Sequence, residues 1–92
     1  MPERASVKEL LRLLGIEDPS ILESLRGEGL FQDEYLGPDA AEELRVALTW
    51  VRDLGVNPAG VEVALQLRRR VLVLEQLTAS SLRRLLSELE GR

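Results

Sequence analysis

The sequence predicts an all-α fold, with two short helices near its start and a longer helical segment at its end. Apolar residues recur at the three- and four-residue spacing of amphipathic helices. Capping residues, proline and glycine stand where such helices would begin and end. The two short helices are joined by a turn that contains glycine, as in a helix-turn-helix. A chain of 92 residues has the size of one domain, 1–92, in which residues 1–56 precede the C-terminal helices of 57–92.

The helix-turn-helix is predicted from residues 6–27. Ser6 and Glu9 have the spacing of a capping box, which satisfies two free N–H groups at a helix start. The apolar residues that follow share one face of the first helix, which ends at Gly15: Val7, Leu10, Leu11 and Leu14. Asp18 is the expected N-cap of the second helix and Pro19 its first residue. Glycines at 27 and 29 end this helix.

Residues 30–36 and the helix after them complete the first half. The segment LFQDEYL is apolar at both ends and polar in the middle, which predicts a small hairpin, or wing. Gly37-Pro38 opens a third helix that Gly55 ends, because proline fits the first turn and glycine the position after the last. The buried stripe of this helix is predicted to comprise Ala40, Leu44, Ala47, Leu48, Val51 and Leu54.

The C-terminal part is predicted to form one long helix or a helical hairpin. Asn57-Pro58 starts a helix that runs to about Leu77, and Ser80 or Ser81 either caps a fifth helix or lies in a bent continuation. Apolar residues cover more than one side of this segment, so it is buried on more than one side. Either a fifth helix folds back over the fourth, or the surface serves a homo-oligomer or another partner. The self-association candidates are Leu65, Leu72, Leu82, Leu86 and Leu89.

The residue types that carry most catalysis are scarce. The chain has no histidine or cysteine, and one lysine and one tyrosine. Nucleophile–base pairs and general acid–base sites draw heavily on these residues. We therefore expect no enzyme, no cofactor and no metal site. The acidic residues Asp33, Glu34 and Asp39 are a weak oxygen-ligand set, and a solvated loop is the favoured interpretation of them.

The charge distribution favours a protein partner over nucleic acid. Residues 1–55 carry a net charge of −6 and residues 56–92 a net charge of +2. Nucleic-acid affinity comes mainly from basic side chains, and the polar face of the second helix offers only Arg26 among acidic and hydroxyl residues. The run Arg68-Arg69-Arg70 is not one patch, because successive helix residues point about 100° apart. Trp50, near the edge of the third helix, is either a binding anchor or a packing residue.

Composition also bears on location and source. The start of the chain, Met1 to Arg4, lacks the basic and apolar stretches of a secretory signal. Apolar runs are far shorter than the roughly 20 residues that span a bilayer. We therefore expect a cytoplasmic protein. Arginine outnumbers lysine eleven to one and asparagine occurs once, a composition that either a GC-rich genome or a thermophilic source would produce.

The order of these segments resembles the CbpM-type chaperone modulators, a family with a MerR-like helix-turn-helix. The resemblance covers about residues 6–77, from the first helix ending in LLGI, through EGLF, to Asp53-Leu-Gly-Val-Asn-Pro-Ala-Gly-Val61. It implies a non-enzymatic adaptor that binds a J-domain co-chaperone of the DnaJ type. It also implies that the adaptor organises or restrains the complex with DnaK, as DnaK–DnaJ assembly factors do.

An interface hypothesis follows from this resemblance. J-domains generally present a basic helix, which an acidic face would complement. The candidate partner-binding residues are Glu28, Asp33, Glu34, Glu42, Glu43 and Trp50. The alternative is a MerR-like DNA-binding transcription regulator. Such regulators usually carry basic residues on the recognition helix and wing, whereas the matching segments here, 21–26 and 31–35, carry one arginine and three acidic residues.

Overall fold

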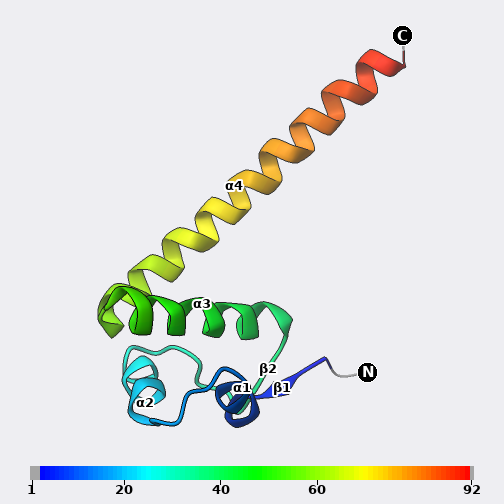
Figure 1. The fold of residues 1–92 in the computed structure, drawn as a ribbon. Helices are drawn as coiled ribbons and strands as arrows, with labels where there is room; N and C mark the ends of the chain where they lie inside the picture. Colours follow the sequence, from blue (N-terminus) through cyan, green and yellow to red (C-terminus); the bar gives the residue numbers. More distant parts are fainter. Residues whose placement is uncertain (1–2, 92) are drawn as a thin grey trace.

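The computed structural model describes residues 3–91 and confirms a predominantly helical fold. Its elements, in chain order, are β1 (Ala5–Ser6), α1 (Val7–Leu13), α2 (Ser20–Gly27), β2 (Tyr35–Leu36), α3 (Pro38–Leu54) and α4 (Pro58–Glu90). The first three helices form a small globular base, and α4 starts on this base and projects far from it (Figure 1). The molecule is therefore elongated, with extents of 59 × 33 × 21 Å. Met1, Pro2 and Arg92 lie outside the described residues, and with them part of the segment expected to lack a signal.

At the ends of α1, the structure confirms the Ser6 N-cap and the position of Gly15, but only one of the two hydrogen bonds of the predicted capping box is present. The Ser6 hydroxyl accepts a hydrogen bond from the Glu9 backbone N–H at 3.5 Å. After the helix, Gly15 has a φ of +75°, a conformation that glycine adopts without strain. The left-handed conformation of Gly15 sets the direction in which the chain leaves α1 toward α2.

The start of α2 lies one residue later than expected. Pro19 occupies the N-cap position, and the Asp18 carboxylate accepts a hydrogen bond from the Ser20 N–H at 2.9 Å. This hydrogen bond from the Ser20 backbone is the main reason that the pKa of Asp18 is lowered. The predicted N-cap at Asp18 is therefore wrong by one residue, although the Asp18 side chain still accepts from the first N–H of the helix.

We expect Asp18→Ala to lower the free energy of unfolding at neutral pH and Asp18→Asn, which keeps an acceptor oxygen, to lower it less. Because folding lowers the pKa of Asp18, its contribution is present above the unfolded pKa, about 3.9, and is lost as pH falls through the folded pKa. Urea unfolding at pH 7 and below pH 3 measures both effects. A difference between wild type and Asp18→Ala that persists unchanged at the lower pH would contradict this role.

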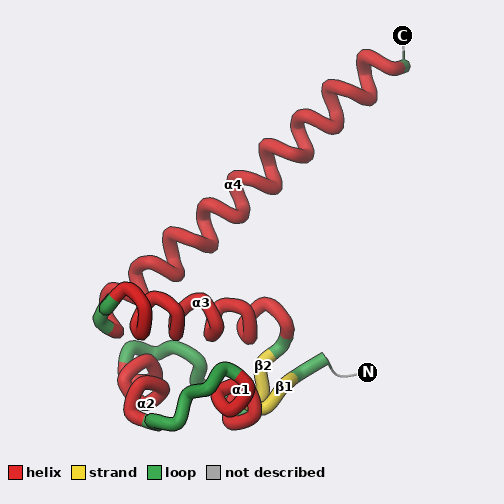
Figure 2. Tube along the Cα trace, viewed as in Figure 1, coloured by secondary structure: helices red, strands yellow, loops and turns green. Residues whose placement is uncertain are grey.

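The prediction that residues 30–36 form a hairpin, or wing, is wrong, because this segment pairs with another part of the chain. Residues 30–34 form an irregular loop, and β2 pairs antiparallel with β1, with Ala5 opposite Leu36 and Ser6 opposite Tyr35 (Figure 2). The Val7 N–H also donates to the Glu34 carbonyl at 2.9 Å. The apolar ends of the segment, Leu30, Phe31 and Leu36, are buried in the core. The strand partner comes instead from the residues just before α1.

Arg26 fastens the loop between α2 and β2. Its Nε donates to the Phe31 carbonyl at 2.8 Å, and its Nη2 donates to the Asp33 carbonyl at 3.4 Å. Phe31 has a φ of +53°, which is uncommon for a bulky residue, and its ring is buried. The guanidinium and the buried ring together hold this left-handed turn in place.

Arg26→Ala should therefore lower the free energy of unfolding by about 1–3 kcal/mol, because hydrogen bonds to charged groups are stronger than neutral ones. Arg12→Ala is the matched control, since Arg12 is exposed on α1. Urea unfolding followed by the fluorescence of Trp50, the single tryptophan, compares the two variants. Equal midpoints would show that the loop does not depend on Arg26.

The core lies where α1, α2, α3 and the first two turns of α4 meet. Its buried residues are Val7, Leu11, Leu22, Leu25, Leu30, Phe31, Leu36, Leu44, Ala47, Leu48, Val61 and Leu65. The predicted stripe of α3 is confirmed at Leu44, Ala47 and Leu48, and Val51 is half-buried against the core. Leu54 is the exception, with 69% of its surface exposed. It occupies the last turn of α3, at the edge of the stripe, where no neighbouring element covers it.

The C-terminal segment is one helix of 33 residues, so the hairpin alternative is wrong. Residues 78–81 lie within this helix, and the Thr78 hydroxyl donates to the Leu74 carbonyl at 2.9 Å. On α4 the core covers Val61 and Leu65, whereas every described residue from 69 onward is exposed. Among the described residues, we find no helix with the length and hydropathy needed to cross a membrane.

Candidate partner-binding surfaces

A shallow acidic depression of about 430 Å³ lies where the loop after α2 meets α3 and α4. Glu28 and Asp33 line it from the loop, Glu43 from α3, and Glu62 from α4. Its apolar floor is formed by Leu30, Phe31 and Leu36. We call these seven residues the acidic depression. The burial of the loop's apolar residues fixes its backbone, and this in turn positions the carboxylates around the rim.

An ion pair closes one side of the acidic depression. Arg69 on α4 donates to Glu43 through Nε at 2.6 Å and Nη2 at 2.8 Å, a two-pronged contact. The Glu43 side chain is only 15% exposed, and its hydrogen bond is the main cause of the raised pKa of Arg69. The charge of Glu43 is therefore largely neutralised within the protein. Glu28 and Asp33 are exposed, whereas Glu62 is half-buried and its Oε1 accepts from Gln66 Nε2.

The structure divides the predicted acidic face. It brings together Glu28, Asp33 and Glu43 but places Glu34 beside a separate hollow that also contains Lys8 and Arg26. Glu42 is exposed and pairs with Arg45 on its own helix, with an Nε–Oε2 distance of 2.9 Å, and this hydrogen bond is the main cause of its lowered pKa. Glu34 and Glu42 therefore do not belong to the acidic depression.

Glu62 belongs to the acidic depression although the sequence did not single it out. It follows the buried Val61 on the first turns of α4, where Gln66 Nε2 also donates to its Oε1. Locating it beside Asp33 requires the tertiary contact of α4 with α2 and α3, which no local pattern predicts.

Trp50 lies on α3 two turns beyond Glu43, and its ring is half-buried against the core. Its carbonyl accepts the Val56 N–H at 3.0 Å, in the turn that leads into α4. Trp50 therefore packs on the fold, and the part of it that remains exposed lies outside the acidic depression.

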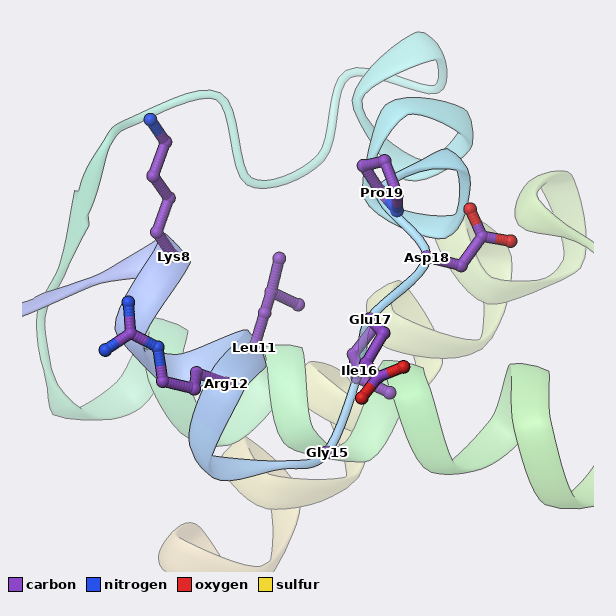
Figure 3. Close-up of a pocket in the computed structure, with 8 residues that line it drawn as sticks. All are labelled: Lys8, Leu11, Arg12, Gly15, Ile16, Glu17, Asp18 and Pro19. Atoms are coloured by element: carbon purple, nitrogen blue, oxygen red, sulfur yellow. The ribbon is translucent and has the colours of Figure 1, made fainter.

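A second hollow of about 340 Å³ separates α1 from the start of α2 (Figure 3). Lys8 and Arg12 stand one turn apart on α1, and Glu17 and Asp18 come from the facing loop. In Figure 3 the basic side chains extend away from the loop that carries the two carboxylates, and Leu11 lies between them. Charges of both signs around an apolar floor define no preferred ligand. The described residues also contain no group of acidic side chains placed to hold a metal ion.

The predicted self-association residues need one correction. Leu65 has no exposed surface, because it packs in the core at the base of α4, so it is unavailable to a partner. Leu72, Leu82, Leu86 and Leu89 are 40–66% exposed on the projecting part of the helix. They do not form one row, since Leu72 lies about 100° around the helix from Leu89.

A scan against family models and searches of curated proteins and solved structures find no match to this chain.

Proposed function

We propose that this protein is a non-enzymatic chaperone adaptor that binds a J-domain co-chaperone and organises or restrains its complex with a DnaK-type chaperone. The observation that carries the proposal is the acidic depression, in which the carboxylates of Glu28, Asp33 and Glu62 line the same hollow as an apolar floor. A basic helix complements such a surface in charge, and its apolar side chains can contact the floor. The proposal also rests on the resemblance of residues 6–77 to CbpM-type modulators, and in particular to the DnaK–DnaJ assembly factor DafA.

The DNA-binding alternative finds less support in the same region. Arg26 is the basic residue of α2, and its guanidinium donates hydrogen bonds to the carbonyls of Phe31 and Asp33. The following loop carries Asp33 and Glu34 and would repel phosphates. A surface that has a helix-turn-helix outline but no free basic residue in this position favours a protein partner.

The proposal is tested by titrating the isolated J-domain of the same organism's DnaJ into the protein by calorimetry. We expect saturable binding that weakens as ionic strength rises, because opposite charges meet at the interface. A fluorescent DNA duplex in parallel titrations tests the alternative. Binding of the duplex together with no heat from the J-domain would replace the adaptor proposal with the regulator.

A further inference from the structure

α4 is held on the globular base over a short stretch near its start. Val61 and Leu65 are fully buried in the core and lie about 6 Å apart along the helix. Beyond Leu65, the hydrogen bonds and ion pairs that join α4 to the base in the described part of the chain all come from Arg69. The helix then continues for about 30 Å away from the base (Figure 1). A tilt of about 10° at the base therefore moves the far end of α4 by about 6 Å.

Arg69 reaches back from α4 to α3. It lies one turn after Leu65, on nearly the same face of the helix. Its guanidinium donates to the Glu43 carboxylate at 2.6 Å from Nε and 2.8 Å from Nη2. These hydrogen bonds are the main cause of the raised pKa of Arg69, and the charges of Glu43 and Glu62 add to their effect. Arg69 thus extends the contact of α4 with the base by about one turn, through a pair of hydrogen bonds that fixes both distance and direction.

The same ion pair forms part of the wall of the acidic depression. Arg69 is the one basic residue among those described that line this hollow, and Glu43 is one of its four carboxylates. The Arg69 side chain is 50% exposed, whereas that of Glu43 is 15% exposed. Arg69 binds both carboxylate oxygens of Glu43, so any other cation that binds Glu43 competes with Arg69 for them.

We propose that the Glu43–Arg69 ion pair is a latch that fixes the direction of α4, and that a basic side chain of the partner opens it by replacing Arg69 on Glu43. The opening step rests on the proposed function, because it requires a basic partner in the acidic depression. Once the latch is open, the buried contacts of Val61 and Leu65 alone hold α4 on the base. Occupation of the acidic depression then widens the range of directions that α4 adopts.

The latch is tested first in the protein alone, by measuring distances between two spin labels. The chain has no cysteine, so Ser24→Cys on α2 and Ser87→Cys near the end of α4 place one label on each part. Both serines are exposed. An excess of unlabelled protein restricts the measurement to distances within one chain. We expect Arg69→Gln to broaden the distance distribution by about 6 Å, the displacement that corresponds to a tilt of about 10°. Identical distributions with and without this substitution would overturn the latch.

Two further variants separate the latch from a general effect of charge. Arg70→Gln removes an equal charge from an exposed residue that lies about 100° around the helix and does not line the acidic depression. Its distance distribution should match the wild type. Exchange of the two charges, by Glu43→Arg with Arg69→Glu, should restore the narrow distribution. Equal broadening in Arg70→Gln and Arg69→Gln would overturn the assignment of the latch to Arg69.

Calorimetric titration with the isolated J-domain tests the opening step. We expect Arg69→Gln to bind the J-domain about fivefold more tightly than the wild type, because the partner no longer has to break a surface ion pair of good geometry. Arg70→Gln should bind within about twofold of the wild type. Equal or weaker binding by Arg69→Gln would overturn the opening step. Absence of binding by all three proteins would refute the chaperone proposal together with the opening step, whereas the spin-label distances decide the latch independently.

Discussion

Leu65→Ala is expected to lower the free energy of unfolding by about 2–5 kcal/mol. The Leu65 side chain is fully buried where α4 meets the base, so truncation leaves a cavity that the neighbouring helices cannot fill without moving. A domain of this size has only about 5–15 kcal/mol of stability in total. The variant should therefore unfold at a much lower urea concentration, as measured by Trp50 fluorescence.

Leu67→Ala provides the matched control. Leu67 lies two residues further along the same helix and is 55% exposed, so the same substitution leaves the core intact. Leu67→Ala should shift the urea midpoint far less than Leu65→Ala. If the two substitutions were equally destabilising, the position of α4 on the base would be wrong.

Charge reversal in the acidic depression should give the largest effect on partner binding. Asp33→Lys combined with Glu62→Lys removes two of the carboxylates that line it and introduces two cations. We expect the affinity for the J-domain to fall at least tenfold, about 1.4 kcal/mol or more, because like charges then face each other. Calorimetric titration measures the loss, and higher salt should partly reverse it.

The control for this double variant changes the net charge by the same amount, but at residues outside the acidic depression. Glu9→Lys with Glu17→Lys alters exposed residues of α1 and of the loop before α2, neither of which lines the acidic depression. Its affinity should stay within about twofold of the wild type, since separated surface charges are screened. Equal losses in both double variants would indicate a general effect of net charge and would remove the acidic depression as the binding site.

The parts of the fold that could be predicted are those set by residues close together in the sequence. The Ser6 cap, the left-handed Gly15 and the Asn57 cap, which accepts the Gly60 N–H at 2.7 Å, all act within a few residues. The sequence therefore predicts the helices and most of their ends. The pairing of β2 with β1 joins segments about 30 residues apart, so the wing was predicted with the wrong partner.

The candidate surfaces were harder to predict because they depend on packing between helices. Leu65 and Leu67 look alike in the sequence, and only the contact of α4 with the base separates a core residue from an exposed one. Likewise, Glu62 and Asp33 are brought together by that contact, whereas Glu42 turns away beside its neighbour Glu43. The charge totals predicted an acidic surface in the first half of the chain. Which residues form the acidic depression could be seen only in the three-dimensional structure.

The most direct test of the adaptor proposal is size exclusion with light scattering on this protein mixed with DnaJ and DnaK from its own organism. We expect one species that contains all three proteins, at a mass that gives their stoichiometry. The protein should co-elute with DnaJ even without DnaK. Elution of the protein unchanged beside both chaperones, at concentrations where it is folded, would contradict the proposal.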